Sequence, residues 1–215
     1  MNLMDIKKIA ETEMGDKRSS PYNERGDKFT HGERVAKLAI RLRELILPND
    51  NSCDDVLMVA AWFHDICNGF GDRAEHAVSG VERTKELLRN NCSQEELDKI
   101  TGIIAVHDDR KPDDNTHSAI IKIHQDADLI DHFGTLDIWR FVAYAIGHGE
   151  TISEAICYMQ NEWPDLLKRW RKELHFDLSK KIFDDRVEFA RLFIERFAVE
   201  GAGEIWNENT IVTEE

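Results

Sequence analysis

The sequence predicts an all-α protein that folds as a single-domain helical bundle. Apolar residues recur with a period of about 3.6 along nearly the whole chain, and no segment alternates with the period of two that is typical of strands. The chain has 215 residues, of which 41% are hydrophobic, so it can bury one sizeable core. We therefore expect one domain rather than two.

This pattern predicts a series of helical segments, and several of them have boundaries with a local cause. In chain order the segments are residues 3–14, 30–47, 53–66, 74–89, 93–106, 118–131, 136–146, 152–174 and 179–198. Thr30 and Ser93 can cap the helices that they begin, and Ser93 forms a capping box with Glu96. Pro48 and Gly69 are expected to end the helices that precede them.

The predicted segment 152–174 contains a proline. Pro164 should break this helix after Glu162 and start a new one, because proline cannot continue a helix but is favoured in a first turn. Trp163 and Trp170 lie seven residues apart on one face of the new helix. We expect both to pack inside the protein, with a homodimer interface as the alternative.

The charge balance bears on the class of ligand. The chain has 28 basic and 42 acidic residues, which gives a net charge of −14, and no run of lysine and arginine forms a stripe. This argues against nucleic acid as a partner. A small anionic substrate remains compatible, because distant surface charges are screened beyond about 10 Å.

The cysteines and the hydropathy pattern bear on the compartment. The four cysteines are scattered and form no CxxC pair, so we read them as reduced thiols. No apolar run approaches the roughly 20 residues that span a bilayer, and the first residues form a polar amphipathic helix rather than a signal peptide. We therefore expect a cytoplasmic protein without a membrane partner.

Ionisable side chains occur at the ends of apolar helical stripes. His64 and Asp65 close a stripe in the segment 53–66, and Asp128 shares a helix face with His124 and Asp131. A buried carboxylate without a partner would cost several kcal/mol. Such a face therefore favours a bound cation, and imidazole together with carboxylate suits a transition metal better than Ca²⁺.

These residues resemble the signature of the HD-domain superfamily of metal-dependent phosphohydrolases. The matching pieces are His31 in HGERV, His64 and Asp65 in WFHDI, and Asp128 in QDADLID, and the match spans residues 29–141. The resemblance implies that these four residues bind one divalent metal. It also implies an HD-domain core at residues 29–148, preceded by a helix and loop at 1–28 and followed by a helical extension at 149–215.

Other residues are expected to bind the substrate or the metal. Arg34, one turn after His31, could hold a phosphate oxygen, with an ion pair to a carboxylate as the equally weighted alternative. His76 and His107 could donate hydrogen bonds to a phosphoryl group or bind a second metal, whereas the alternative is a histidine paired with a nearby carboxylate. Asp131 is expected to orient a metal ligand.

The resemblance implies that a metal-bound hydroxide hydrolyses a phosphate ester of a small metabolite. We expect this metabolite to be a nucleotide. The expected metal is Mn, Fe, Co, Ni or Zn. Asp65 would both bind this metal and steer the proton of the attacking water. A monophosphatase branch of the family has an acidic residue three positions after Asp65, where this chain has Asn68, so that mechanism does not transfer intact. Asp72 or Glu75 could substitute.

Two other functions remain open. One is a di-iron HD-type oxygenase, for which His76 and His107 would complete the second iron site. The other is a non-catalytic module that senses a nucleotide, which Asn68 favours.

Overall fold

The computed structural model describes residues 1–68, 76–111 and 116–207, which form ten helices and no strand. The first six helices are α1 (Leu3–Met14), α2 (Asp27–Ile46), α3 (Asp54–Phe63), α4 (His76–Leu88), α5 (Gln94–Ala105) and α6 (Ala119–Asp131). The last four are α7 (Thr135–His148), α8 (Ile152–Asn161), α9 (Trp163–Glu173) and α10 (Asp177–Gly201). The predicted all-α fold is confirmed.

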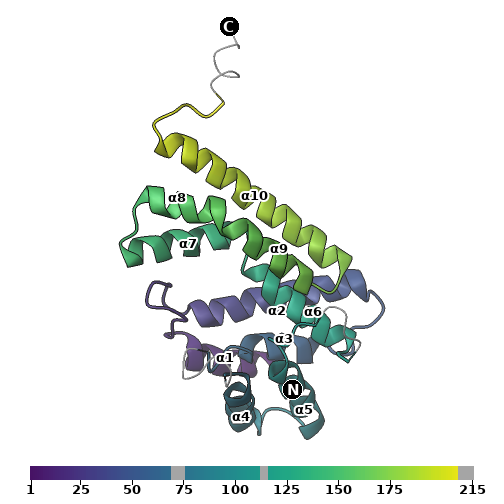
Figure 1. The fold of residues 1–215 in the computed structure, drawn as a ribbon. Coiled ribbons are helices and arrows are strands. Elements are labelled where there is room, and N and C mark those ends of the chain that lie inside the picture. Colours follow the sequence, from purple (N-terminus) through teal and green to yellow (C-terminus); the bar gives the residue numbers. More distant parts are fainter. Residues whose placement is uncertain (69–75, 112–115, 208–215) are drawn as a thin grey trace.

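The helices form two layers (Figure 1). In the first layer, α2 packs against α3 and α6, α3 packs against α5 and α1, and α4 pairs with α5. In the second layer, the long helix α10 packs against α7, α8 and α9, and it also contacts α6. α6 therefore belongs to the core of the first layer and supports the second.

Most predicted boundaries agree with the structure within a few residues. Ser93 and Glu96 form the predicted capping box, and the predicted break at Pro164 separates α8 from α9. Trp163 is buried and Trp170 is partly buried, in agreement with packing inside the protein. The division into residues 1–28, 29–148 and 149–215 remains a prediction.

Two predicted boundaries were wrong. Thr30 does not cap α2, because the helix begins at Asp27 after Gly26, and the Thr30 hydroxyl instead donates to the carbonyl of Asp27 at 3.1 Å. The helix α3 ends at Phe63 rather than near Gly69, which lies outside the described residues. His64 and Asp65 are therefore in the turn that follows α3.

The carboxylate of Asp126 joins the two layers. Its two oxygens accept hydrogen bonds from the backbone N–H groups of His175 at 2.9 Å and Phe176 at 3.1 Å, immediately before α10. Neighbouring Gln125 accepts a hydrogen bond at 2.7 Å from the His175 ring and donates one at 2.6 Å to the carbonyl of Val106. These contacts hold the end of α5 and the segment before α10 against α6.

No described helix has the length and apolar character needed to cross a lipid bilayer. All four cysteines are free thiols.

Candidate metal centre

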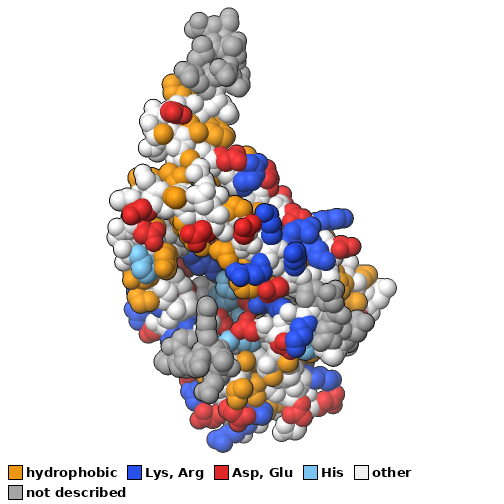
Figure 2. Space-filling view, in the orientation of Figure 1, with side chains coloured by type: hydrophobic (Ala, Val, Ile, Leu, Met, Phe, Trp, Pro, Cys, Tyr) orange, Lys and Arg blue, Asp and Glu red, His pale blue; other side chains and the backbone are white. Residues whose placement is uncertain are grey.

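A cleft of about 1370 Å³ lies between the two layers. Figure 2 shows it as a hollow in which histidine and acidic side chains are visible. Of the residues predicted from the sequence, His31, Arg34, Asp65, His76 and Asp128 line this cleft. The structure thus brings together residues that are as much as 97 positions apart in the chain.

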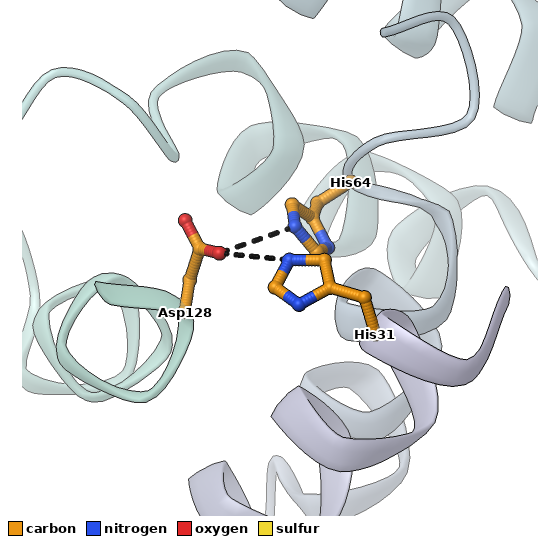
Figure 3. Close-up of side chains that lie close together, drawn as sticks. All are labelled: His31, His64 and Asp128. Atoms are coloured by element: carbon orange, nitrogen blue, oxygen red, sulfur yellow. Dashed lines mark hydrogen bonds and ion pairs between the residues drawn. The ribbon is translucent and has the colours of Figure 1, made fainter. Parts of the chain in front are cut away.

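His31, His64 and Asp128 converge at the floor of the cleft (Figure 3). One carboxylate oxygen of Asp128, Oδ1, lies 3.1 Å from Nε2 of His31 and 3.4 Å from Nε2 of His64. All three side chains are buried. Two imidazole nitrogens and a carboxylate oxygen at these distances form a set of ligands suited to a divalent transition metal.

The other ring nitrogen of each histidine has an acceptor that holds the ring in place. Nδ1 of His64 donates to the carbonyl of Ala61 at 2.8 Å, and Nδ1 of His31 lies 2.8 Å from Oδ2 of Asp131. Nε2 of His64 is buried and has no hydrogen-bond partner among the described residues. A buried ring nitrogen in this position fits a metal ligand, because metal-binding histidines usually donate their second ring N–H to a neighbouring acceptor.

The close contact of two helices depends on a glycine. A Cβ atom at Gly32 would lie 2.9 Å from the carbonyl oxygen of Ala61 and 3.2 Å from Cα of Trp62. Gly32 therefore lets α2 approach the end of α3, which brings the rings of His31 and His64 within 5.1 Å of each other.

Asp65, His76 and His107 form a second group of ligands beside the first. Nε2 of His107 lies 3.7 Å from Oδ1 of Asp65 and 3.0 Å from Nε2 of His76. Nδ1 of His107 donates to the carbonyl of Ile104 at 2.7 Å, as His64 does to Ala61. The sequence analysis placed Asp65 with the first metal, whereas the structure places it between the two groups, with Oδ2 at 3.9 Å from Nε2 of His64.

At the floor of the cleft, burial disfavours the charged form of each side chain, and close partners of opposite charge favour it. Burial alone would lower the pKa of His31, but its hydrogen bonds to Asp128 and Asp131 outweigh this and raise the pKa to about 10. Burial likewise disfavours charged His107, yet Asp65 raises the pKa of that ring to about 9. Burial would raise the pKa of Asp128, but His64 and Arg110 hold it well below the usual range.

For Arg34, the sequence left two roles open, phosphate binding and an ion pair with a carboxylate. The structure shows the ion pair. The guanidinium of Arg34 donates through Nε at 3.0 Å and through Nη2 at 2.9 Å to the two oxygens of Asp131. Asp131 also accepts from His31, and its role in orienting a metal ligand remains a prediction. Arg34 thus stabilises this carboxylate, and its role toward a substrate also remains a prediction.

Three residues of the cleft were missed by the sequence analysis. Arg110 is mostly buried and donates through Nη2 to Asp128. The ring of His132 lies 4.9 Å from that of His31, with Nε2 3.6 Å from Oδ1 of Asp128. Lys28 is buried and lines the cleft. His132 had a detectable signal, since it follows Asp128 by one helical turn, whereas Arg110 lies in a polar connection without periodicity.

His124 lies behind the floor rather than in it. The side chain is fully buried 5.3 Å from the ring of His64, and burial lowers its pKa well below the usual value. Asn68 lines the cleft and donates from Nδ2 to Oδ2 of Asp65 at 3.0 Å. Asp72 and Glu75, proposed as substitutes for a missing acid, lie outside the described residues.

No model of a known protein family matches the chain, and neither does any curated protein sequence. Solved structures do match. An HD-superfamily hydrolase from Bacillus thuringiensis is 21% identical, with a TM-score of 0.65 over 94% of this chain and 97% of the other. A predicted HD superfamily hydrolase from an uncultured Thermotogales bacterium is also 21% identical, with a TM-score of 0.60 over 92% of both chains.

YpgQ of Bacillus subtilis, solved in complex with ADP, is similar to the same degree. It is 21% identical, with a TM-score of 0.63 over 90% of this chain and 92% of YpgQ. The protein therefore has the HD-domain fold, and the resemblance predicted from the sequence is confirmed at the level of the fold. Within that fold, the chain has a buried His/Asp cluster that could hold a metal ion.

Proposed function

We propose that the protein is a metal-dependent phosphohydrolase that cleaves a phosphate ester or anhydride of a nucleotide. The observation that carries the proposal is the convergence of His31, His64 and Asp128 at the floor of an open cleft, with two ring nitrogens that point at one carboxylate oxygen. The HD-domain fold of hydrolases and the ADP bound by YpgQ support it.

Each residue of the floor has a part in this proposal. His31, His64 and Asp128 would hold the metal with Asp65, and the bound metal would supply Lewis-acid activation of water and neutralise phosphate charge. Asp65 lies beside His64 and His107, which despite burial hold the pKa of its carboxyl well below the usual range, so its ionised carboxylate could orient the attacking water by accepting a hydrogen bond from it. Asn68 donates to Asp65 and orients it, but an amide cannot act as the base itself.

Cations beside the floor can bind the phosphate. Arg110 donates to Asp128, Lys28 is buried and lines the cleft, and Nε2 of His76, which also lines the cleft, lies 3.0 Å from Nε2 of His107. When a metal occupies Asp128, the guanidinium of Arg110 is able to turn toward a phosphate oxygen, for which its planar fork is well suited. Among the predicted binding residues, His76 and Arg34 line the cleft, although Arg34 is engaged with Asp131, whereas His107 is buried beside it.

The test is the metal content of protein purified without chelator, measured beside phosphate and pyrophosphate release from nucleotides with added Mn²⁺, Co²⁺, Ni²⁺ or Mg²⁺. The proposal expects about one transition metal per chain and release that depends on it. The His64→Ala variant should lose both. Stoichiometric metal without turnover of any phosphorylated compound would contradict the proposal and favour a nucleotide sensor.

The group of Asp65, His76 and His107 favours a second candidate function, a di-iron oxygenase. Its ligand atoms lie within 4.8 Å of one another, beside the first group, so two metals could share Asp65. Two irons per chain with consumption of O₂ would support this candidate. A full complement of one non-iron metal with phosphate release would exclude it.

A further inference from the structure

The part of the cleft beyond the metal centre is lined by aromatic side chains that the proposed reaction does not use. They come from α7, α8 and α9 and are Phe141, Tyr144, Tyr158, Trp163 and Trp170. The rings of Phe141 and Tyr158 are stacked, with centroids 6.1 Å apart and planes 10° from parallel. Figure 2 shows hydrophobic side chains along the edge of the hollow. We call these five residues the aromatic groove, and its walls suit a flat ring.

The carboxylate of Asp137 lies against one of these rings, that of Trp163. Its Oδ2 accepts a hydrogen bond from Nε1 of Trp163 at 3.0 Å, while no hydrogen bond from the described part of the chain ends on Oδ1. The residue lines the cleft, and burial raises the pKa of Asp137 to about 6. Oδ1 of this cleft-lining carboxylate is therefore available to accept a hydrogen bond from a ligand that supplies an N–H group.

A row of polar side chains connects the metal centre to Asp137. His132 lies 3.6 Å from Asp128, and its Nδ1 lies 3.1 Å from Nη1 of Arg140. Arg140 follows Asp137 by three residues on α7, so both occur on the same helix face, and both line the cleft. One ligand can therefore place its phosphate over the metal centre and its ring in the aromatic groove.

We propose that Asp137 accepts an N–H hydrogen bond from a nucleobase held in the aromatic groove, so that the enzyme selects bases with a donor edge, guanine above all. This inference rests on the proposed function. Guanine presents two adjacent N–H donors, N1–H and the 2-amino group, that match a carboxylate, whereas uracil flanks its one donor with two carbonyl acceptors. A site that hydrogen-bonds a substrate group discriminates strongly against analogues without it.

The Asp137→Asn variant tests this assignment with little structural change. The amide oxygen of asparagine still accepts from Trp163, but its NH₂ group replaces the free acceptor with a donor. We expect wild-type protein with Mn²⁺ to show a kcat/KM for GTP at least about tenfold above that for UTP. In Asp137→Asn, the kcat/KM for GTP should fall about 10- to 100-fold through KM, while that for UTP changes less than about threefold.

Asp165→Asn is the matched control, because it makes the same change to an exposed carboxylate of α9 that does not line the cleft. Its ratio of kcat/KM between GTP and UTP should stay like that of the wild type. Equal kcat/KM values for GTP and UTP in the wild type, or an unchanged ratio in Asp137→Asn, would overturn the inference.

A binding measurement separates this inference from the proposed function. Calorimetric titration of the wild type and Asp137→Asn with guanosine and uridine needs no hydrolysis. Binding of guanosine to the wild type and its loss in Asp137→Asn would support the base site even if no nucleotide were hydrolysed, in which case the proposed function alone would fail. Equal binding of guanosine by both proteins, or binding by neither, would overturn the base site whatever the activity.

Discussion

At the scale of single residues, the candidate site depends on how each metal ligand is held. His31 and His64 present Nε2 because Nδ1 of each ring is fixed, by Asp131 and by the carbonyl of Ala61 respectively. Asp131 is itself fixed by Arg34. The orientation of these candidate ligands is therefore set by residues that would not themselves touch a metal, and substitution of those residues should weaken metal binding without removing a ligand.

Substitution of Asp131 should show this effect. Asp131→Ala removes the acceptor for His31 and leaves Arg34 without its partner, so we expect metal affinity to fall about 10- to 100-fold. Asp131→Asn keeps one oxygen acceptor and should lose less. The measurement is a competitive titration of Mn²⁺ against a fluorescent chelator. Equal affinities in wild type and Asp131→Ala would show that Asp131 does not orient the ligand.

Asn68 tests the relation to monophosphatases. Asn68→Glu places a carboxylate beside Asp65, where it could accept a proton from water, so we expect phosphate release from nucleoside monophosphates to increase severalfold. Asn68→Gln, which keeps the amide, is the control and should not increase it. Release is measured with deoxynucleoside monophosphates and Co²⁺ or Mn²⁺. If Asn68→Glu and Asn68→Gln release phosphate at the same rate, position 68 does not correspond to the acidic residue of the monophosphatase branch.

At the scale of helices, α6 carries several distinct contacts within a few residues. Gln125 and Asp126 hold the segments after α5 and before α10, Asp128 enters the candidate metal centre, and Asp131 orients His31. The periodicity of the sequence predicted that Asp128 and Asp131 share a buried face. It could not predict what Gln125 and Asp126 bind, because their partners belong to segments distant in sequence.

The approach of α2 to α3 can be tested at Gly32. In Gly32→Ala the new methyl would meet backbone atoms, which cannot move independently, so we expect a loss of about 1–3 kcal/mol in the free energy of unfolding and weaker metal binding. Gly102→Ala in α5 is the control, since a Cβ there meets nothing within 4 Å and should stabilise the helix by up to about 1 kcal/mol. Urea denaturation of both variants measures whether Gly32→Ala lowers and Gly102→Ala raises the free energy of unfolding.

The loop before α2 contacts α7 through the aromatic ring of Tyr22. The Tyr22 ring lies on Gly147, where a Cβ would be 2.0 Å from the ring, and it packs 4.6 Å from the ring of His148. Tyr22 also lines the cleft, so this contact closes one side of it.

Gly147→Ala should therefore displace Tyr22, because a side chain yields more easily than a helix. We expect trypsin to cleave after Arg18 or Arg25 severalfold faster in Gly147→Ala, with little change in the melting temperature. Tyr22→Ala should have the same effect, and the double variant should add nothing to it. Wild-type cleavage rates in Gly147→Ala would mean that the contact does not restrain the loop.

At the scale of the whole molecule, the sequence predicted the fold better than the site. Helical periodicity can be recognised from the sequence alone. The same is true of the short motifs that contain the candidate ligands His31, His64 and Asp128. Arg110 and the aromatic groove are assembled from several helices, so only their arrangement in space identifies them. The placement of Arg34 likewise depended on a carboxylate 97 positions away.

The metal should stabilise the whole molecule, because its ligands come from α2, the turn after α3, and α6, which together form the core of the first layer. Metal that binds only the folded state at 100 times its Kd adds about 2.7 kcal/mol to the free energy of unfolding. For a chain of this size, that corresponds to a rise in melting temperature of about 5–10 °C. Calorimetry of chelator-treated protein with and without Mn²⁺ measures this rise. Asp128→Asn should abolish it, because this variant weakens the one carboxylate that both histidines face. An equal rise in Asp128→Asn would place the stabilising metal elsewhere in the molecule.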